Sequence, residues 1–255
     1  MKPIKADLPS EINSIELHPF ADFHLGDMMS DFTHITAMIE HIKNTPNAYC
    51  ILNGDMMDTA IASSVGDTYG ANLQPMEQLK QAVMLFAPIK SKILCVTPGN
   101  HENRVYRTDG IDMTHLMCAQ LDIENLYTPT TAALYIRFGR NHKGRKTCYT
   151  VYVTHGSGGG RKEGGKINRL SDLTQIVDAD IYIHSHTHLP AAFKSDFCRL
   201  DVQNSTVQQI TKLFVNTSSQ LNYGGYGDAQ GYKPSCKDNP VILLKGDRKE
   251  MQVLL

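Results

Sequence analysis

Short apolar runs typical of β-strands alternate with helical patterns through much of this 255-residue chain. Six runs predict strands, at residues 15–20, 48–52, 92–97, 134–138, 149–154 and 180–184. Apolar residues at three-to-four spacing predict helices at residues 31–42, 75–86, 113–121 and 170–177. Strands that alternate with helices are typical of an α/β sheet covered by helices.

The last third of the chain has strand-like runs but no clear helix. These runs lie at residues 193–202, 208–215, 241–245 and 251–254, and we expect them to form a second, mostly antiparallel sheet. The predicted fold is therefore α/β, a four-layer α-β-β-α sandwich of two mixed sheets flanked by helices. Because no Pro-, Ser- or Gly-rich linker divides the chain, we expect residues 1–255 to be a single domain.

Composition narrows the class of protein. A hydrophobic fraction of 41% and a charged fraction of 20% are ordinary for a globular protein. No apolar stretch approaches the roughly 20 residues of a membrane span, and the first 20 residues lack a signal-peptide pattern. The six cysteines include no close pair, which argues against a disulfide framework or a paired-thiolate zinc site. We expect a cytoplasmic protein without membrane contact.

Polar side chains follow five of the predicted strands, at the point where each strand ends. Ligands of α/β sheets bind beyond the carboxyl ends of the strands, and carboxylate, amide and imidazole groups bind divalent metals. A set of about seven such groups exceeds one tetrahedral site and indicates two ions that share a bridging carboxylate. The candidate ligands come from the following nine strand-end residues: Asp22 and His24, Asp55 and Asp58, Asn100 and His101, His155, and His186 and His188.

These motifs resemble those of the calcineurin-like metallophosphoesterase superfamily, and the chain is similar to its compact bacterial and phage members. The family signature is Asp-x-His, Gly-Asp-x-x-Asp, Gly-Asn-His-Asp/Glu, His-Gly and Gly-His-x-His. All five occur in this order between Asp22 and His188, across about two thirds of the chain. One position departs, because Ser185 stands where the family usually has Gly.

The resemblance implies a role for each matched residue. One ion would be held by Asp22, His24, Asp55 and His188, and the second by Asp55, Asn100, His155 and His186. Catalysis would use His101, near the leaving group or the transition-state charge, and Asp58, which would orient His101. We expect two divalent ions, with Mn²⁺ as the preferred ion and Fe, Zn, Ni or Mg as alternatives. They would activate a bridging hydroxide for in-line attack on a phosphate ester.

The charge distribution favours an extended anionic substrate. Residues 1–130 hold 8 Lys+Arg against 16 Asp+Glu, whereas residues 131–255 hold 17 against 10. Clustered cations attract polyanions, so we expect a phosphodiester of nucleotide or nucleic-acid type. We interpret the Gly-rich segment 156–167 as a flexible basic loop. The candidate substrate-binding residues are Arg104, Arg161, Lys162 and Lys166, with a surface salt bridge as the alternative for Arg104 and a solvated loop for the other three.

Two other functions stay open. One is a phosphomonoesterase or protein phosphatase of the same family, although Thr59-Ala60 stands where the protein phosphatases typically have Arg-Gly. The other is a catalytically silent metal-binding scaffold, which the full set of matched ligands disfavours.

Several residues receive no firm role. His184 is interpreted as a structural or outer residue of the site. A loop with Tyr223, Tyr226 and Tyr232 could stack on a base, cover the site, form a homodimer contact or be a simple turn. The remaining histidines are interpreted as ordinary surface or core residues: His18, His34, His41, His115 and His142.

Overall fold

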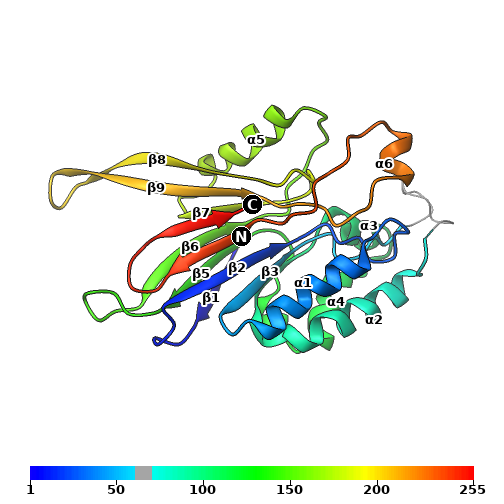
Figure 1. Cartoon of the computed structure of the whole chain (residues 1–255), viewed down its shortest axis with the longest axis horizontal. Coiled ribbons are helices and arrows are strands. Elements are labelled where there is room, and N and C mark those ends of the chain that lie inside the picture. Colours follow the sequence, from blue (N-terminus) through cyan, green and yellow to red (C-terminus); the bar gives the residue numbers. More distant parts are fainter. Residues whose placement is uncertain (61–70) are drawn as a thin grey trace.

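The computed structural model describes residues 1–60 and 71–255 and contains two mixed β-sheets (Figure 1). The six-stranded sheet has the order β1-β5-β6-β7-β9-β8, and the five-stranded sheet has the order β11-β10-β2-β3-β4. The first comprises β1 (Lys2–Asp7), β5 (Ala132–Phe138), β6 (Thr147–Val153), β7 (Ile181–His184), β9 (Thr206–Asn216) and β8 (Ala191–Asp201). The second comprises β11 (Met251–Leu254), β10 (Val241–Lys245), β2 (Ser14–Phe20), β3 (Ala48–Asn53) and β4 (Ile93–Thr97).

Helices cover the outer face of each sheet, which gives the predicted α-β-β-α layers (Figure 1). Near the five-stranded sheet lie α1 (Phe32–Asn44), α2 (Pro75–Phe86), η1 (Ala87–Lys92), α3 (Asn100–Asp109), α4 (Met113–Gln120) and η2 (Glu124–Leu126). On the other side lie α5 (Glu163–Asp172) and η3 (Leu173–Gln175), and a short α6 (Gly225–Ala229) follows β9.

Local sequence signals explain the helix boundaries. The Asp31 carboxylate accepts a hydrogen bond from the backbone N–H of His34 at 3.0 Å and caps α1. Pro75 starts α2, a position where its missing N–H costs nothing. In α1, the buried residues Ile35, Ile39 and Ile42 recur at three-to-four spacing and pack toward the five-stranded sheet.

Strand alternation produces separate cores on the two faces of the five-stranded sheet. Ile15 and Leu17 of β2 lie in the core between the sheets, whereas Phe20 lies in the core beneath the helices. A third core, with Leu170 and Tyr182, lies between α5 and the six-stranded sheet. Packing on both faces explains why β3 and β4 are buried at every position.

The expectation of a separate sheet for the last third of the chain is wrong. β9 pairs parallel with β7, and β8 pairs antiparallel with β9, so the hairpin of β8 and β9 extends the six-stranded sheet. β10 pairs antiparallel with β2, and β11 with β10, so these strands complete the other sheet. Apolar periodicity reports which face of a strand is buried but not which strand lies beside it.

Other boundaries also differ from the predictions. The helix expected at residues 170–177 is α5, which begins at Glu163 inside the Gly-rich segment and is followed by a 3₁₀ turn. That segment is therefore a loop only as far as Lys162. β1 and α3 are not predicted from the sequence, because β1 is a short edge strand and α3 is a polar helix directly after a strand end.

Among the helices of residues 1–60 and 71–255, none has both the length and the apolar character needed to cross a bilayer.

Candidate metal centre

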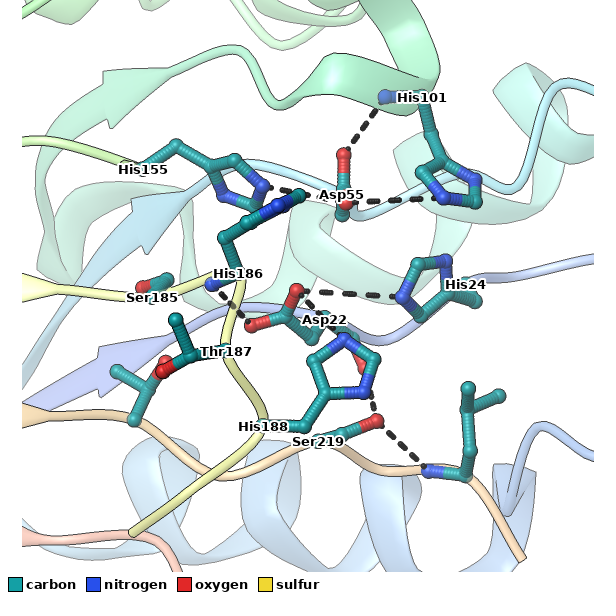
Figure 2. A network of polar contacts seen from close by, with 12 residues as sticks. Asp22, His24, Asp55, His101, His155, Ser185, His186, Thr187, His188 and Ser219 are labelled. Atoms are coloured by element: carbon teal, nitrogen blue, oxygen red, sulfur yellow. Dashed lines mark hydrogen bonds and ion pairs between the residues drawn. The ribbon is translucent and has the colours of Figure 1, made fainter. Parts of the chain in front are cut away.

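The loops after five strands bring the sequence-predicted ligands to one end of the sandwich. Figure 2 shows Asp22 and Asp55 in the middle of the group, with imidazoles around them. β2 leads to Asp22, β3 to Asp55, β4 to His101, β6 to His155 and β7 to His186. Parallel pairing of β2 with β3, of β3 with β4, and of β6 with β7 aligns these carboxyl ends at the same edge.

Asp22 is completely buried and faces two of the predicted imidazole ligands. Its Oδ1 lies 3.2 Å from Nε2 of His188 and 3.9 Å from Nε2 of His24. Its Oδ2 accepts a hydrogen bond from the backbone N–H of His186 at 3.1 Å. Burial disfavours the charged carboxylate, but the neighbouring imidazole of His188 outweighs it and lowers the pKa of Asp22.

Asp55 is the second buried carboxylate and faces the other side of the group. Its Oδ2 lies 3.1 Å from Nε2 of His155, and its Oδ1 accepts a hydrogen bond from the backbone N–H of His101 at 2.8 Å. Burial opposes ionisation, yet the charges of His155 and His101 hold the pKa of Asp55 well below its ordinary value. The carboxylate is therefore ionised.

Backbone strain is concentrated at this group. The left-handed region is sterically costly for residues other than Gly, at about 1–3 kcal/mol each. Positive φ angles of 48–66° occur at five of the candidate ligands: Asp22, His24, Asp55, His186 and His188. Strain persists only where the surroundings impose it, so the fold holds these side chains toward one point at a cost in stability.

His101 and Asp58 form the pair expected for a positioned acid. The Asp58 Oδ1 lies 2.9 Å from Nδ1 of His101, and the Asp58 carbonyl oxygen lies at the same distance. This fixes Nδ1 of His101 as the donor and leaves Nε2, 3.9 Å from Asp55 Oδ2, facing the centre. Burial alone would lower the pKa of His101, but the charges of Asp55 and Asp58 outweigh the effect of burial and raise this pKa.

His155 is oriented by a backbone carbonyl. Its Nδ1 lies 2.7 Å from the carbonyl oxygen of Asn53, so Nδ1 carries the proton and Nε2 faces Asp55 and, at 3.2 Å, Oδ1 of Asn100. Such an arrangement is typical of a metal-binding histidine. His186 is also suited to bind a cation, because burial and the nearby charge of His155 lower its pKa to about 4 and keep it neutral.

Two buried atoms that make no hydrogen bond indicate that a cation fits the site. Within the described residues, Asp22 Oδ1 and His24 Nε2 are buried and have no hydrogen-bond partner. Both are atoms of predicted ligands, and an unsatisfied buried polar group is costly. Three clusters at this site each have ligand atoms within 4.8 Å of one another. Two contain the buried carboxylates of the predicted ligands, namely Asp22 with His24 and His188, and Asp55 with His155 and His186; the third contains His24, Asp58 and His101. Their carboxylate and imidazole donors suit divalent transition metals.

Glu102 supports the ligand loops, a role that the sequence analysis did not assign. Its buried carboxylate accepts hydrogen bonds from the backbone N–H groups of Asp55 (3.0 Å), Met57 (2.9 Å) and Gly99 (2.9 Å). The loops after β3 and β4 are thereby tied together. A Glu three residues after the residue that precedes a helix is a recognised capping signal, so Gly99 to Glu102 could have revealed this role.

We expect Glu102→Gln to lower the free energy of unfolding by about 1–3 kcal/mol and to weaken metal binding. The amide keeps one acceptor oxygen but turns an NH₂ donor toward backbone N–H groups, which leaves buried donors unsatisfied. Urea unfolding and metal titration measure both effects. Glu77→Gln is the matched control, because Glu77 caps α2 in the same way from an exposed position. Equal losses in both variants would contradict this role of Glu102.

Asn53 and Ser185 join the two sheets directly below the ligands. Asn53 donates hydrogen bonds to the Thr154 carbonyl at 2.8 Å and to Ser185 Oγ at 2.7 Å, and its Oδ1 accepts one from Thr97 Oγ1 at 2.7 Å. Ser185, the position that departs from the family signature, is therefore built into a buried hydrogen-bond network. Its side chain occupies this network rather than the ligand positions.

The four basic residues that the sequence suggested for substrate binding make different contacts. Lys166, in α5, donates a hydrogen bond to the carbonyl of Thr187, between two candidate ligands, at 2.7 Å. Arg161 instead donates to the Gln230 carbonyl at 2.9 Å and lies over the ring of Tyr232. Arg104 lies in α3, and its charge opposes protonation of His101. Lys162 is exposed at the start of α5.

His184 does not belong to any of the metal-binding clusters found in the described residues. Its Nδ1 lies 2.7 Å from Oδ1 of Asn216, and Gly156 approaches so closely that a Cβ there would lie 2.1 Å from Nε2 of His184. Of the three tyrosines, Tyr223 and Tyr232 are exposed, and the side chain of Tyr226 lies outside the described residues.

Comparison with known proteins identifies a related family. The family model of calcineurin-like phosphoesterases matches residues 20–190. No curated protein matches the chain. Similar solved structures include a predicted phosphoesterase from Streptococcus pneumoniae TIGR4, at 14% identity and a TM-score of 0.41, with 95% of this chain and 90% of that chain covered.

Two further solved structures are similar at the same level. A Vps29 single mutant from Entamoeba histolytica has 12% identity and a TM-score of 0.45, with 94% and 90% of the two chains covered. A metallophosphoesterase from Sphaerobacter thermophilus has 12% identity and a TM-score of 0.38, with 91% and 84% covered.

Proposed function

Because the chain belongs to the calcineurin-like phosphoesterase family and is a metal-dependent phosphoesterase, we propose that it uses two divalent ions to hydrolyse phosphodiesters of nucleotide or nucleic-acid type. The observation that carries the two-ion proposal is the pair of ligand clusters around Asp22 and Asp55, at adjacent strand ends. With a single ion, one of the two buried carboxylates would have only protonated imidazoles as partners of opposite charge.

The proposed ligands combine the two clusters with the roles that the family resemblance implies, which add Asp55 to the first set and Asn100 to the second. The first ion is assigned to Asp22, His24, Asp55 and His188, and the second to Asp55, Asn100, His155 and His186. When bound, two divalent ions supply Lewis acidity that acidifies a water and neutralises phosphate charge. Mn²⁺ is our preferred ion because the shell mixes oxygen and imidazole donors, and Fe, Zn, Ni and Mg are alternatives.

The remaining chemistry belongs to His101 and Asp58. The hydrogen bond from Nδ1 to Asp58 directs Nε2 of His101 toward the centre, where it would donate its proton to the departing oxygen. Asp58 acts through His101 and is a positioning residue. The lowered pKa of Asp58, which the hydrogen bond from His101 produces against the effect of burial, keeps it ionised for this task.

A substrate panel tests the proposed activity. With each metal supplied in turn, hydrolysis of bis-p-nitrophenyl phosphate should exceed hydrolysis of p-nitrophenyl phosphate, and cyclic nucleotides and single-stranded DNA and RNA should identify the natural class. Mn²⁺ should give the highest rate. Activity confined to monoesters would reject the phosphodiester proposal and favour a phosphomonoesterase or protein phosphatase. Bound metal without turnover of any phosphate ester would identify a silent metal-binding scaffold.

Lys162 offers a separate test of substrate charge. We expect Lys162→Gln to reduce the dependence of nucleic-acid binding on salt by about one unit of log–log slope, because one phosphate contact would be lost. Binding measured between low and high salt gives this slope. Lys43→Gln is the control, because Lys43 is an exposed lysine of α1 that pairs with Glu40. An unchanged slope in Lys162→Gln would remove Lys162 from the substrate site, for which Arg104, Arg161 and Lys166 would stay proposed.

The organisation of the protein is also part of the proposal. Residues 1–255 are proposed to act as one domain, because strands from the first and last parts of the chain share both sheets. A cytoplasmic location and a homodimer stay predictions from the sequence. Cell fractionation and sedimentation of the purified protein would check them.

A further inference from the structure

A second group of potential metal-binding side chains lies on β2 and α1 and shares no residue with the candidate metal centre. Glu16 and His18 are the third and fifth residues of β2, and His41 lies in the last turn of α1. The Glu16 Oε2 atom lies 3.1 Å from Nε2 of His18 and 2.8 Å from Nε2 of His41. The ring centroids of His18 and His41 are 5.2 Å apart.

Strand and helix geometry bring these side chains together. Residues two apart on a strand point to the same face, so Glu16 and His18 share the face of β2 that Phe20 presents to the helices. Ile15 and Leu17 face the opposite core. α1 packs on the helix-covered face through its buried isoleucines, which places His41 over β2.

The three donor atoms have the spacing of a metal site. Zinc–nitrogen and zinc–oxygen bonds of about 2.0–2.2 Å in a tetrahedral site separate neighbouring ligand atoms by roughly 3.3 Å. The two separations from Glu16 Oε2, 3.1 and 2.8 Å, are slightly shorter than this value, and all three donor atoms lie within 4.8 Å of one another. Two imidazoles and one carboxylate suit zinc and the neighbouring transition metals, and do not suit Ca²⁺ or Mg²⁺.

Both imidazoles address the same carboxylate oxygen. Without a metal, each Nε2 must carry a proton to donate to Glu16 Oε2. One divalent ion replaces both protons and binds all three atoms. The His18 residue is only 8% exposed, whereas the His41 side chain is 49% exposed. An ion there would thus have a rigid ligand on the sheet and an open side toward solvent.

We propose that Glu16, His18 and His41 bind one transition-metal ion of the zinc class and thereby join α1 to β2. This site does not depend on the phosphoesterase chemistry, because none of its residues belongs to the candidate metal centre. Its ion would stabilise the contact between helix and strand. Under this proposal, His18 and His41 are metal ligands and not ordinary surface or core residues.

Zinc titration and anomalous diffraction test the site. Crystals of the full chain soaked in Zn²⁺ and measured on both sides of the zinc absorption edge should show an anomalous peak between these three side chains. In calorimetric titration, His41→Gln and Glu16→Gln should each weaken zinc binding at this site by at least about tenfold, since even loss of a supporting residue costs 10–100-fold. Hydrolysis of phosphate esters should be unchanged in both variants.

His115→Gln is the matched control. The His115 side chain is about as exposed as that of His41, and its Nε2 lies 3.2 Å from Oε1 of Glu124. It does not belong to any of the metal-binding clusters found in the described residues. Its zinc titration should equal that of the wild type. No anomalous peak at Glu16, His18 and His41 under saturating Zn²⁺, or wild-type zinc binding in both His41→Gln and Glu16→Gln, would overturn the proposal. The position of an anomalous peak identifies the side chains around the ion, so zinc bound at the catalytic site would not be mistaken for zinc at this site.

Discussion

Asp55→Asn is expected to lower kcat/KM for phosphate esters by on the order of 10³-fold. Stabilisation of transition-state charge by a metal is worth several kcal/mol, and each ~1.4 kcal/mol corresponds to a factor of ten. Asp55 is the proposed bridge between the two ions, so its neutral amide weakens both. Hydrolysis of bis-p-nitrophenyl phosphate, with metal content measured by mass spectrometry, gives the loss in rate and in bound ions.

The substitution is designed to preserve the backbone. Asp55 has a φ of 53°, and Asn is among the residues that tolerate this region. The Asn oxygen can still accept the hydrogen bond from the backbone N–H of His101. Asp122→Asn is the matched control, because Asp122 also has a positive φ, of 58°. Its side chain is 82% exposed and pairs with Lys90, not with a candidate ligand. Full activity and metal content in Asp55→Asn would reject the ligand assignment.

Removal of divalent metal is expected to lower the unfolding temperature by about 8–16 °C. A ligand at 1,000 times its Kd stabilises the folded state by about 4 kcal/mol, and each kcal/mol shifts the unfolding temperature of a protein of this size by about 2–4 °C. The physical origin is the buried carboxylate of Asp22, whose Oδ1 has no hydrogen-bond partner, and the strained left-handed backbone around it. Thermal unfolding in EDTA and in excess Mn²⁺ measures the difference.

Two variants separate specific binding from a general salt effect. Asp55→Asn should lose most of the Mn²⁺-dependent increase, whereas Asp122→Asn should keep it. His41→Gln should also keep it, provided Mn²⁺ is the added ion, because the proposed site of Glu16, His18 and His41 favours zinc. Identical unfolding temperatures in EDTA and Mn²⁺ for the wild type would contradict a metal-dependent folded state.

The extent to which the fold was predictable differs between its local and long-range features. The helix at Pro75–Phe86 and the strands at Val241–Lys245 and Met251–Leu254 coincide with their predicted ranges. Their boundaries depend on neighbours in sequence, such as the initial Pro75. The assignment of the last strands to a sheet of their own failed, because pairing of β9 with β7 and of β10 with β2 depends on contacts far apart in sequence.

The sequence was sufficient to name the candidate ligands that the structure brings together, but not the residues that support them. Strand-end motifs were sufficient to name Asp22, Asp55 and His155, because metal-binding donors in a characteristic order leave a direct trace in the sequence. Glu102 acts through backbone N–H groups of two loops, and Asn53 acts through Ser185 and Thr97. Such hydrogen bonds require the loops to be placed first, so residue types alone do not reveal them.

The sequence by itself thus determined the alternation of strands and helices, the family resemblance and the donors offered for metal. Only the tertiary structure decided which strands pair, that Arg161 contacts Gln230 and Tyr232, and that His18 and His41 meet at Glu16. The reason is physical: periodicity and motifs are set by residues close in the chain. By contrast, contacts such as Glu16–His41, Arg161–Tyr232 and Ser14–Lys245 join residues 25, 71 and 231 positions apart and exist only after the sheets and helices have packed.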